Sequence, residues 1–303
     1  MAPGAGRARD SDPALCEMVA AALERRMIAM QISVEHMRTL RPDDMAAATE
    51  LSRLAGWNQT ADDWRMLLDL APAGCFAIES DGQLVSTTTV VCYGKRLAWI
   101  GMVLTSPEFR GRGFARRLLA HALDYANSLG IETVKLDATD QGKKLYEKFG
   151  FHPEQSIERW VLPGTSNTAL PGASSRPPRY SPTLDLDAIC VDRTDMLEHL
   201  ARRSHVYSHS KAFLFARAGR ATAYLGPCLA NDPADVRVHV TECIHASPHA
   251  SWSWDLFPAN HNAVAIASEL GFKRQRQLTR MALGKPLRGR DDFIYAIAGF
   301  ELG

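Results

Sequence analysis

Hydrophobic positions along the chain alternate between helical and strand spacing from about residue 37 onward. Two segments with apolar residues three and four apart are predicted helices, and Thr60 is the expected N-cap of the second because acidic residues follow it at once. Three β-rich runs joined by Asp-Gly and Gly-Lys pairs predict consecutive hairpins. In chain order the predicted elements are a strand (37–40), two helices (42–55 and 60–70), three strands (75–80, 83–93 and 97–104), a long helix (114–129), a strand (133–137), a short helix (142–149) and a strand (157–162).

The turn between the third hairpin strand and the long helix has the chemistry of a pyrophosphate site. Pro107 ends the strand, and residues 110–113 then have the sequence Arg-Gly-Arg-Gly. Glycines allow the backbone to approach a ligand closely, and the N-terminus of a helix offers unpaired N–H groups and a positive dipole end. An ordinary strand–helix turn with two glycines is the structural alternative. A dinucleotide fingerprint and a Walker A loop are both absent from this segment.

The order of hydrophobic strand, V-x-x-x-P-x-x-R-G-x-G-x-A and long helix resembles the acetyl-CoA-binding motif of the GNAT superfamily of N-acetyltransferases. The motif core, R/Q-x-x-G-x-G/A, is matched by Arg110, Gly113 and Ala115. The resemblance implies an α/β (α+β) fold, a mixed and mostly antiparallel sheet flanked by helices, over residues 35–163. It also implies acetyl-CoA as the acyl donor, bound by two groups of residues: Met102, Val103 and Leu104 beside the pantetheine arm, and Arg110, Gly111, Arg112, Gly113, Phe114 and Ala115 at the pyrophosphate.

The same resemblance suggests two catalytic residues. Tyr146 matches the family tyrosine that protonates the departing sulfur, although a tyrosine packed in the core would have the same spacing. The asparagine that family members often carry before this tyrosine is missing, and the loop here is Asp137-Ala-Thr-Asp-Gln-Gly. Asp137 is the predicted general base, because it ends the strand that the family separates from the CoA-binding strand. It could equally cap the following loop, and many GNAT enzymes use water or a backbone carbonyl instead.

The connection between the first two helices is predicted to select the acceptor. Trp57, Asn58 and Trp64 could enclose a small amine, but tryptophans at helical spacing also belong to many protein cores. This stretch and the final segment, residues 294–303, resemble a group of tandem-GNAT proteins. The resemblance implies direct transfer of an acetyl group to a primary amine in a ternary complex. The near-neutral charge of the chain favours a small amine, of the amino acid or polyamine class, over a basic protein tail or an aminoglycoside. A protein acetyltransferase and a non-catalytic acyl-CoA sensor are the alternatives.

Two segments of the first half recur in the second half at nearly the same separation. Residues 94–101 are echoed by 219–226, and residues 144–151 by 265–272, which predicts a second copy of the fold. Pro233-Ala-Asp-Val-Arg-Val stands where the glycine loop should recur, and Ala267 stands in place of Tyr146. The predicted domains are therefore an extension (1–34), a catalytic GNAT domain (35–163), a Pro- and Gly-rich linker (164–180) and a degenerate GNAT-like domain without CoA (181–303).

Composition and charge argue against nucleic acid, a membrane and a metal ion as partners. The formal net charge of +1 gives no electrostatic reason to expect nucleic acid, and no apolar run approaches the length of a membrane span. The six cysteines are dispersed and predict free thiols in the cytoplasm. Among the histidines, His245 and His249 are spaced for a metal but separated by Ser and Pro, so no metal site is expected. Charges in the first thirty residues are balanced and match neither a secretory nor an organellar signal. A monomer or a homodimer is expected.

Overall fold

A computed structural model describes residues 34–165, 180–209 and 211–303. Most of the predicted extension and linker lies outside these ranges. The first half contains β1 (Glu35–Thr39), α2 (Met45–Leu54), α3 (Ala61–Leu70), β2 (Cys75–Ser80), β3 (Gln83–Tyr93), β4 (Leu97–Thr105), α4 (Phe114–Ser128), β5 (Thr133–Ala138), α5 (Asp140–Glu147) and β6 (His152–Leu162). The second half contains α6 (Pro182–Ile189), α7 (Thr194–Ala201), β7 (His205–His209), β8 (Ala212–Arg217), β9 (Ala223–Ala230), α8 (Pro233–Ala246), β10 (Trp252–Leu256), α9 (His261–Glu269), β11 (Lys273–Gly284) and β12 (Ile294–Ala296).

The first-half elements follow the predicted order, and local chemistry explains their ends. Thr60 is the N-cap of α3, as the sequence predicts, and the structure adds that Thr60 and Asp63 form a reciprocal capping box. Gly130, with a φ of 68°, follows the end of α4 in the left-handed conformation that glycine adopts most easily. In the described residues, no helix has the length and apolar character needed to cross a membrane.

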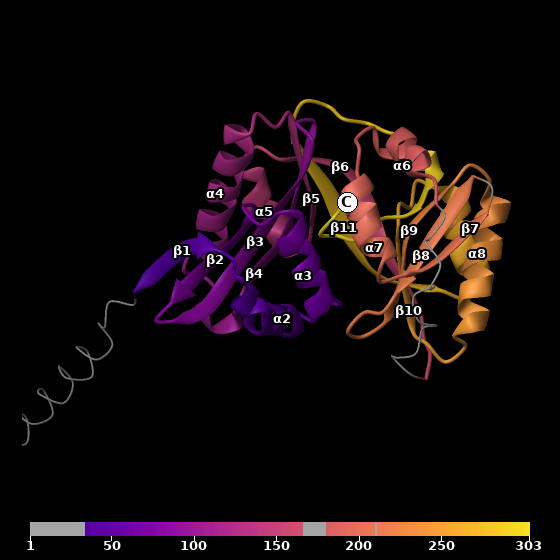
Figure 1. The fold of residues 1–303 in the computed structure, drawn as a ribbon, viewed down its shortest axis with the longest axis horizontal. Helices are drawn as coiled ribbons and strands as arrows, with labels where there is room; N and C mark the ends of the chain where they lie inside the picture. The colour runs from indigo at the N-terminus through magenta and orange to yellow at the C-terminus, as the bar shows by residue number, and fades with distance from the viewer. Residues whose placement is uncertain (1–33, 166–179, 210) are drawn as a thin grey trace, which may run out of the picture.

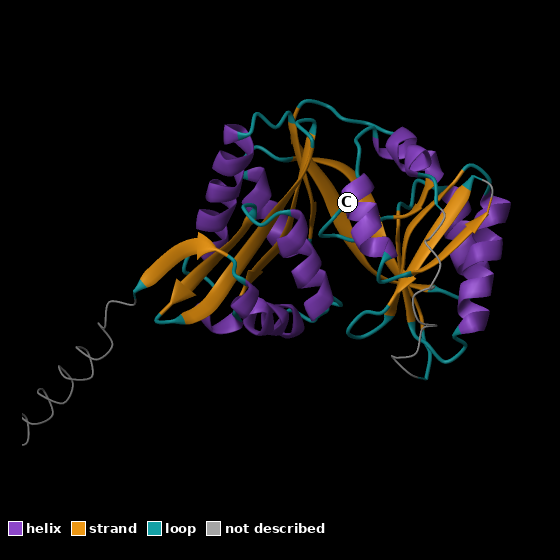
Figure 2. Cartoon of the chain, viewed as in Figure 1, coloured by secondary structure: helices purple, strands orange, loops and turns teal. Residues whose placement is uncertain are grey.

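The two halves share one sheet, because they exchange a strand (Figures 1 and 2). The strand order is β1-β2-β3-β4-β5-β11-β6-β10-β9-β8-β7, with β12 beside β9. The last long strand of the second half, β11, pairs antiparallel with β5 of the first half, while β6 pairs antiparallel with β10. The exchanged strands also pair with each other. The polypeptide therefore crosses between the halves twice within the sheet.

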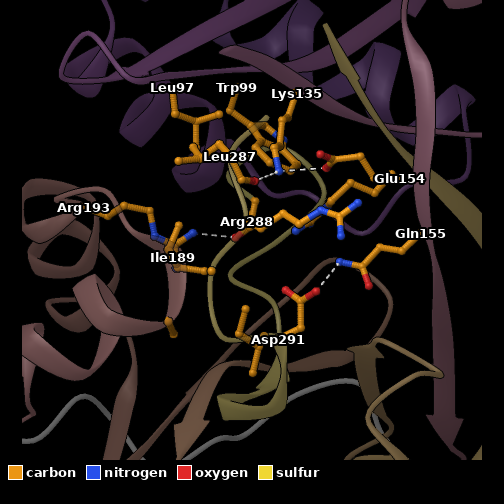
Figure 3. Close-up of a pocket in the computed structure, with 15 residues that line it drawn as sticks. Leu97, Trp99, Lys135, Glu154, Gln155, Ile189, Arg193, Leu287, Arg288 and Asp291 are labelled. Carbon is orange, nitrogen blue, oxygen red and sulfur yellow. Dashed lines mark hydrogen bonds and ion pairs between the residues drawn. The ribbon is translucent and has the colours of Figure 1, made fainter. Parts of the chain in front are cut away.

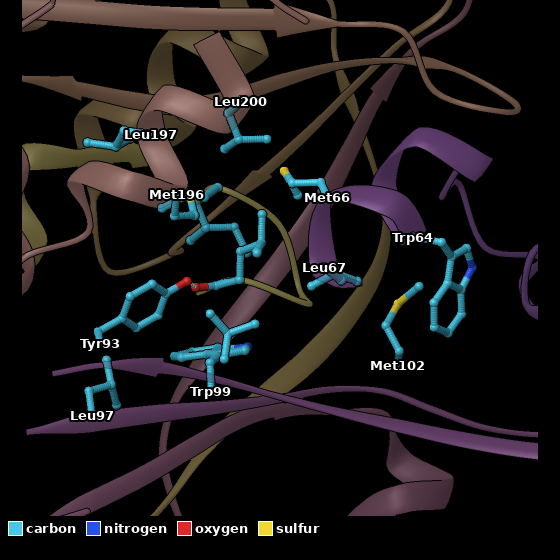
Figure 4. Close-up of a cluster of buried hydrophobic side chains, with 14 of the residues drawn as sticks. Trp64, Met66, Leu67, Tyr93, Leu97, Trp99, Met102, Met196, Leu197 and Leu200 are labelled. Carbon is cyan, nitrogen blue, oxygen red and sulfur yellow. Dashed lines mark hydrogen bonds between the residues drawn. The ribbon is translucent and has the colours of Figure 1, made fainter. Parts of the chain in front are cut away.

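Three apolar clusters fill the layers. One lies between the first half of the sheet and helices α4 and α5, and another lies under α8 and α9 in the second half. The largest is shared: α3 contributes Trp64 and Leu67, and α7 contributes Leu197 and Leu200 (Figure 4). This common core holds the second half against the face of β4 that bears Trp99.

Candidate active site

Strand β4 is distorted at the position where the sequence predicts the acyl group. Its register against β3 shifts between Thr87 and Thr89, so one extra β4 residue is accommodated as a bulge. Met102 has a φ of 50°, a conformation that is strained for a non-glycine residue. The Thr87 hydroxyl donates to the Met102 carbonyl at 2.9 Å, which helps to hold this geometry.

Strands β4 and β5 pair with each other only at their first residues, and then they separate. Their parallel ladder ends at the pair Trp99 and Lys135, although β4 continues to Thr105 and β5 to Ala138. The edge of β4 that faces β5 therefore lacks strand partners at Met102, Val103 and Leu104. An extended ligand arm can use such backbone groups as an added strand would.

The loop at the end of β4 leads straight into α4. Gly111 and Gly113 have φ values of 79° and 82°, and Gly113 is the residue that precedes the first turn of the helix. A Cβ built on either glycine would meet no atom within 4 Å, so backbone conformation, not crowding, requires glycine there. Arg110 and Arg112 are exposed beside this open space. Positive charge, a helix N-terminus and accessible backbone together fit a pyrophosphate.

Tyr146 lies on α5 and packs within the core under α4 and α5. Its ring meets Phe151 edge-on at 6.1 Å between centroids, and a Cβ on Gly142 would lie 2.9 Å from the ring. Burial raises the pKa of the Tyr146 hydroxyl well above its ordinary value, so the group carries its proton at neutral pH. The ring of Tyr146 therefore packs in the core, as the structural alternative expects, and the acid role of its hydroxyl stays a prediction.

Asp137 forms a buried ion pair with Arg280. Both of its carboxylate oxygens accept hydrogen bonds from Arg280 of β11, at 2.9 and 3.0 Å, and its side chain has no exposed surface. The Arg280 guanidinium lies over the rings of Trp99 and Phe257. Burial raises the pKa of Asp137, and Arg280 opposes that rise. The predicted base thus joins the first half to an exchanged strand, which favours a structural role.

The predicted acceptor residues do not form a box. Trp64 has no exposed surface, and its indole N–H donates to Ser52 at 3.0 Å, so it belongs to the core, a correction to the prediction. The Asn58 side chain binds backbone groups of Ala221 and Thr222 in the second half. Trp57 is half-buried, and its carbonyl accepts from Arg220. The connection between α2 and α3 therefore docks the second half.

Two family models match the chain. Residues 38–151 match the acetyltransferase (GNAT) family, and residues 182–296 match a second acetyltransferase (GNAT) domain. Together these matches account for most of the chain. The protein belongs to the GNAT acetyltransferases. Its two GNAT domains stand in tandem, in agreement with the repeat in the sequence.

Named relatives and solved structures agree with this family. The chain is 25% identical over 178 residues to the uncharacterized N-acetyltransferase YitH of Bacillus subtilis, covering 56% of this chain and 62% of YitH. It is 32% identical over 102 residues to the uncharacterized N-acetyltransferase YhbS of Escherichia coli, covering 31% of this chain and 58% of YhbS. These matches thus span about three-fifths of each relative.

The solved structures show the same fold. A Pyrococcus horikoshii protein assigned to the acetyltransferases superposes with a TM-score of 0.78 at 20% identity, covering 89% of this chain and 96% of its own. A tandem GNAT protein from the clavulanic acid biosynthesis pathway gives 0.57 at 15% identity, covering 84% and 99%.

In the second GNAT domain the corresponding cleft is filled. Strand β9 pairs with β10 only as far as Leu225 and Trp254, and β12 then takes the same edge of β9. The Trp254 indole donates to the Tyr295 carbonyl at 2.7 Å, which ties β12 to β10. By the repeat, Pro227 stands where the first domain has Met102, and it has no N–H to donate.

The residues after β12 extend back onto the first GNAT domain. The Trp99 indole donates to the Phe300 carbonyl at 2.9 Å, and the Tyr93 hydroxyl donates to the Leu302 carbonyl at 2.8 Å. Sequence reasoning assigned no role to Glu301 of this segment; the only signal was the resemblance of residues 294–303 to tandem GNAT proteins.

A cavity of about 200 Å³ lies between the domains on the same face of β4 (Figure 3). Trp99 lines it, together with charged residues such as Lys135, which pairs with Glu154 at 2.7 Å, and Arg288 of the second domain. The described residues contain no group of three or more His, Cys, Asp or Glu side chains arranged to hold a metal ion.

Proposed function

We propose that the protein is an acetyl-CoA-dependent N-acetyltransferase whose acceptor is the primary amine of a small molecule. One observation carries the proposal: the first GNAT domain keeps an open edge of β4 that runs from the bulge at Met102 to the glycine loop at the start of α4. Membership of the family supports the acyl donor, which supplies an activated thioester.

Each group of residues has a distinct task in this proposal. Arg110, Arg112 and the backbone of Gly111–Gly113 bind the pyrophosphate. Backbone N–H groups at Met102–Leu104 polarise the thioester carbonyl, since fixed donors stabilise the negative charge that develops on its oxygen. Tyr146 delivers a proton to the departing sulfur.

Coverage of the acceptor side supports a small acceptor, such as an amino acid or a polyamine. Residues 299–303 lie on the face of β4 that an amine would approach, and α7 packs over the same core. A polypeptide would need an open groove along this face. The protein acetyltransferase is therefore less favoured, and the open cofactor edge, together with a tyrosine at the position of the family acid, argues against a sensor without catalysis.

The free thiols of the five described cysteines support a reducing, cytoplasmic setting.

The test is a thiol-release screen of acetyl-CoA with the full chain against amino acids, polyamines and peptides. We expect release with at least one small primary amine and none above background with peptides. Calorimetry with CoA runs in parallel, so that cofactor binding without release with any amine would identify a sensor and overturn the enzymatic proposal.

A further inference from the structure

The second GNAT domain places a carboxyl group beside the bulge of the first. A Cβ built on Gly101, the residue before Met102, would lie 2.8 Å from Cα and 3.1 Å from Cβ of Glu301. Glu301 is 3% exposed. Glycine at 101 is therefore what allows residues 299–303 to lie directly on β4.

Polar groups without partners surround this position. Thr89 is opposite Gly101 in the ladder and so projects to the same face of the sheet. Its hydroxyl is buried and, among the described residues, has no hydrogen-bond partner. The same holds for Oε1 of Gln59, whose amide N–H donates to Glu301 at 2.8 Å. Buried polar atoms in this condition point to a missing ligand or water.

Glu301 and Gln59 line a small cavity between the domains, of about 20 Å³, enough for about one water molecule. Asp63 and Arg217 line it as well, from α3 and β8.

Among the buried carboxyls of the described residues, Glu301 is the one that no arginine side chain holds by a hydrogen bond. Asp137, Asp185 and Asp255 each pair with a guanidinium through both oxygens. The guanidinium of Arg217, by contrast, donates to the carbonyls of Gly226 and Ala298. A proton acceptor needs such freedom, since a carboxylate in a bidentate pair is already saturated on that side.

We propose that Glu301 is the general base of the acetyl transfer. The inference rests on the proposed function. The Glu301 carboxylate takes one proton from the acceptor ammonium, and the neutral amine forms the C–N bond at the thioester carbon. The C–S bond breaks, Tyr146 protonates the sulfur, and the second nitrogen proton returns to the tyrosine oxygen through solvent. The products are the acetamide, CoA thiol and a protonated Glu301.

The electrostatic surroundings suit this task. Burial raises the pKa of Glu301, Asp63 raises it further, and Arg217 opposes both. Arg159 of β6 and Tyr224 of β9 also face the carboxyl. A base titrating nearer to neutral pH than an ordinary glutamate is better matched to accepting a proton from an amine.

The experiment compares Glu301→Gln, Glu301→Asp and the control Glu132→Gln in the full chain. Glu132 is a partly exposed carboxyl that pairs with Lys285 at the start of β5. We expect Glu301→Gln to bind CoA within about twofold of wild type and to lower kcat for thiol release by ~10²-fold, the usual scale for a lost general base. The acid limb of its pH–rate profile should disappear, Glu301→Asp should recover part of the rate, and Glu132→Gln should match wild type.

A second measurement does not depend on turnover. A carboxyl whose pKa is raised by folding adds stability below its unfolded pKa of about 4.3, and this contribution is lost as pH rises through the folded pKa. As pH rises from 4 to 8, the Tm of wild type should therefore fall relative to the Tm of Glu301→Gln.

The outcomes separate the two proposals. Wild-type rates in Glu301→Gln, or a Tm difference independent of pH, would overturn the base assignment alone. An absence of thiol release by the wild-type chain with every amine would overturn the proposed function, and the base with it. Loss of fold in Glu301→Gln leaves Glu301→Asp to decide, because equal loss of CoA affinity and rate in that variant would mark Glu301 as structural.

Discussion

Both GNAT domains contain a cleft between two separating strands, which is open in the first domain and filled in the second. In the first, β4 and β5 separate after Trp99 and leave the edge of β4 open. In the second, β9 and β10 separate after Leu225, and β12 of the same chain occupies the edge. The fold alone therefore does not make a cofactor site. An unpaired strand edge, backbone donors at the bulge and a glycine loop before the helix are needed together.

A second comparison concerns the ion pairs of the exchanged strands, here called the exchange pairs: Asp137 with Arg280, and Asp255 with Arg159. Each joins an aspartate of one domain's inner strand to an arginine of the strand received from the other, and the two pairs have nearly the same geometry. Because one pair occurs in the domain with a filled cleft, the arrangement does not need catalysis to explain it.

The largest effect we predict is that the first cleft binds acetyl-CoA and the second does not. Calorimetric titration of the full chain with acetyl-CoA should give one site per chain, since β12 already fills the second cleft and Pro227 offers no N–H. Two equivalent sites would break the comparison.

The exchange pairs should be equivalent in stability. Asp137→Asn and Asp255→Asn should each lower the free energy of unfolding by about 3–5 kcal/mol, because removing one partner leaves a buried guanidinium uncompensated. Urea unfolding measures both, with Glu50→Gln of an exposed pair on α2 as control. If Asp137→Asn kept wild-type stability but lost turnover, Asp137 would return as the base.

A substitution should weaken CoA binding when it alters the glycine loop before α4, and not merely because it replaces a glycine with positive φ. Gly113→Val should weaken CoA binding about 100-fold, since charge-assisted hydrogen bonds of about 1.5–3 kcal/mol each are lost. The matched control is Gly82→Val, in the turn between β2 and β3, where φ is 79° against 82° at Gly113. Equal affinities in the two folded variants, measured by calorimetry, would remove the pyrophosphate assignment.

The last prediction separates a packing role of Tyr146 from a catalytic one. Tyr146→Phe keeps the ring in its core and should lower kcat by ~10²-fold with little change in CoA affinity. Tyr125→Phe on α4 serves as control, because that ring also packs in the first domain, against Phe76. Unchanged turnover in Tyr146→Phe would leave Tyr146 with a structural role only.

Local features of this protein followed from sequence alone. The N-cap at Thr60, the hairpins of β2, β3 and β4, and the glycine loop before α4 depend on residues that are neighbours in the chain. Spacing and conformational preference were therefore enough to predict them. The tandem repeat was also visible, since two short segments recur in the same order.

Only the tertiary structure decided which side chains meet. The pair Asp137 and Arg280 joins residues from opposite halves, and so does the contact of Asn58 with Thr222, because the strand exchange and the shared core bring them together. The filled cleft at β12 and the position of Glu301 on β4 have the same origin. Hydrophobic periodicity specifies which face of a strand is buried, but it carries no information about which distant segment covers that face.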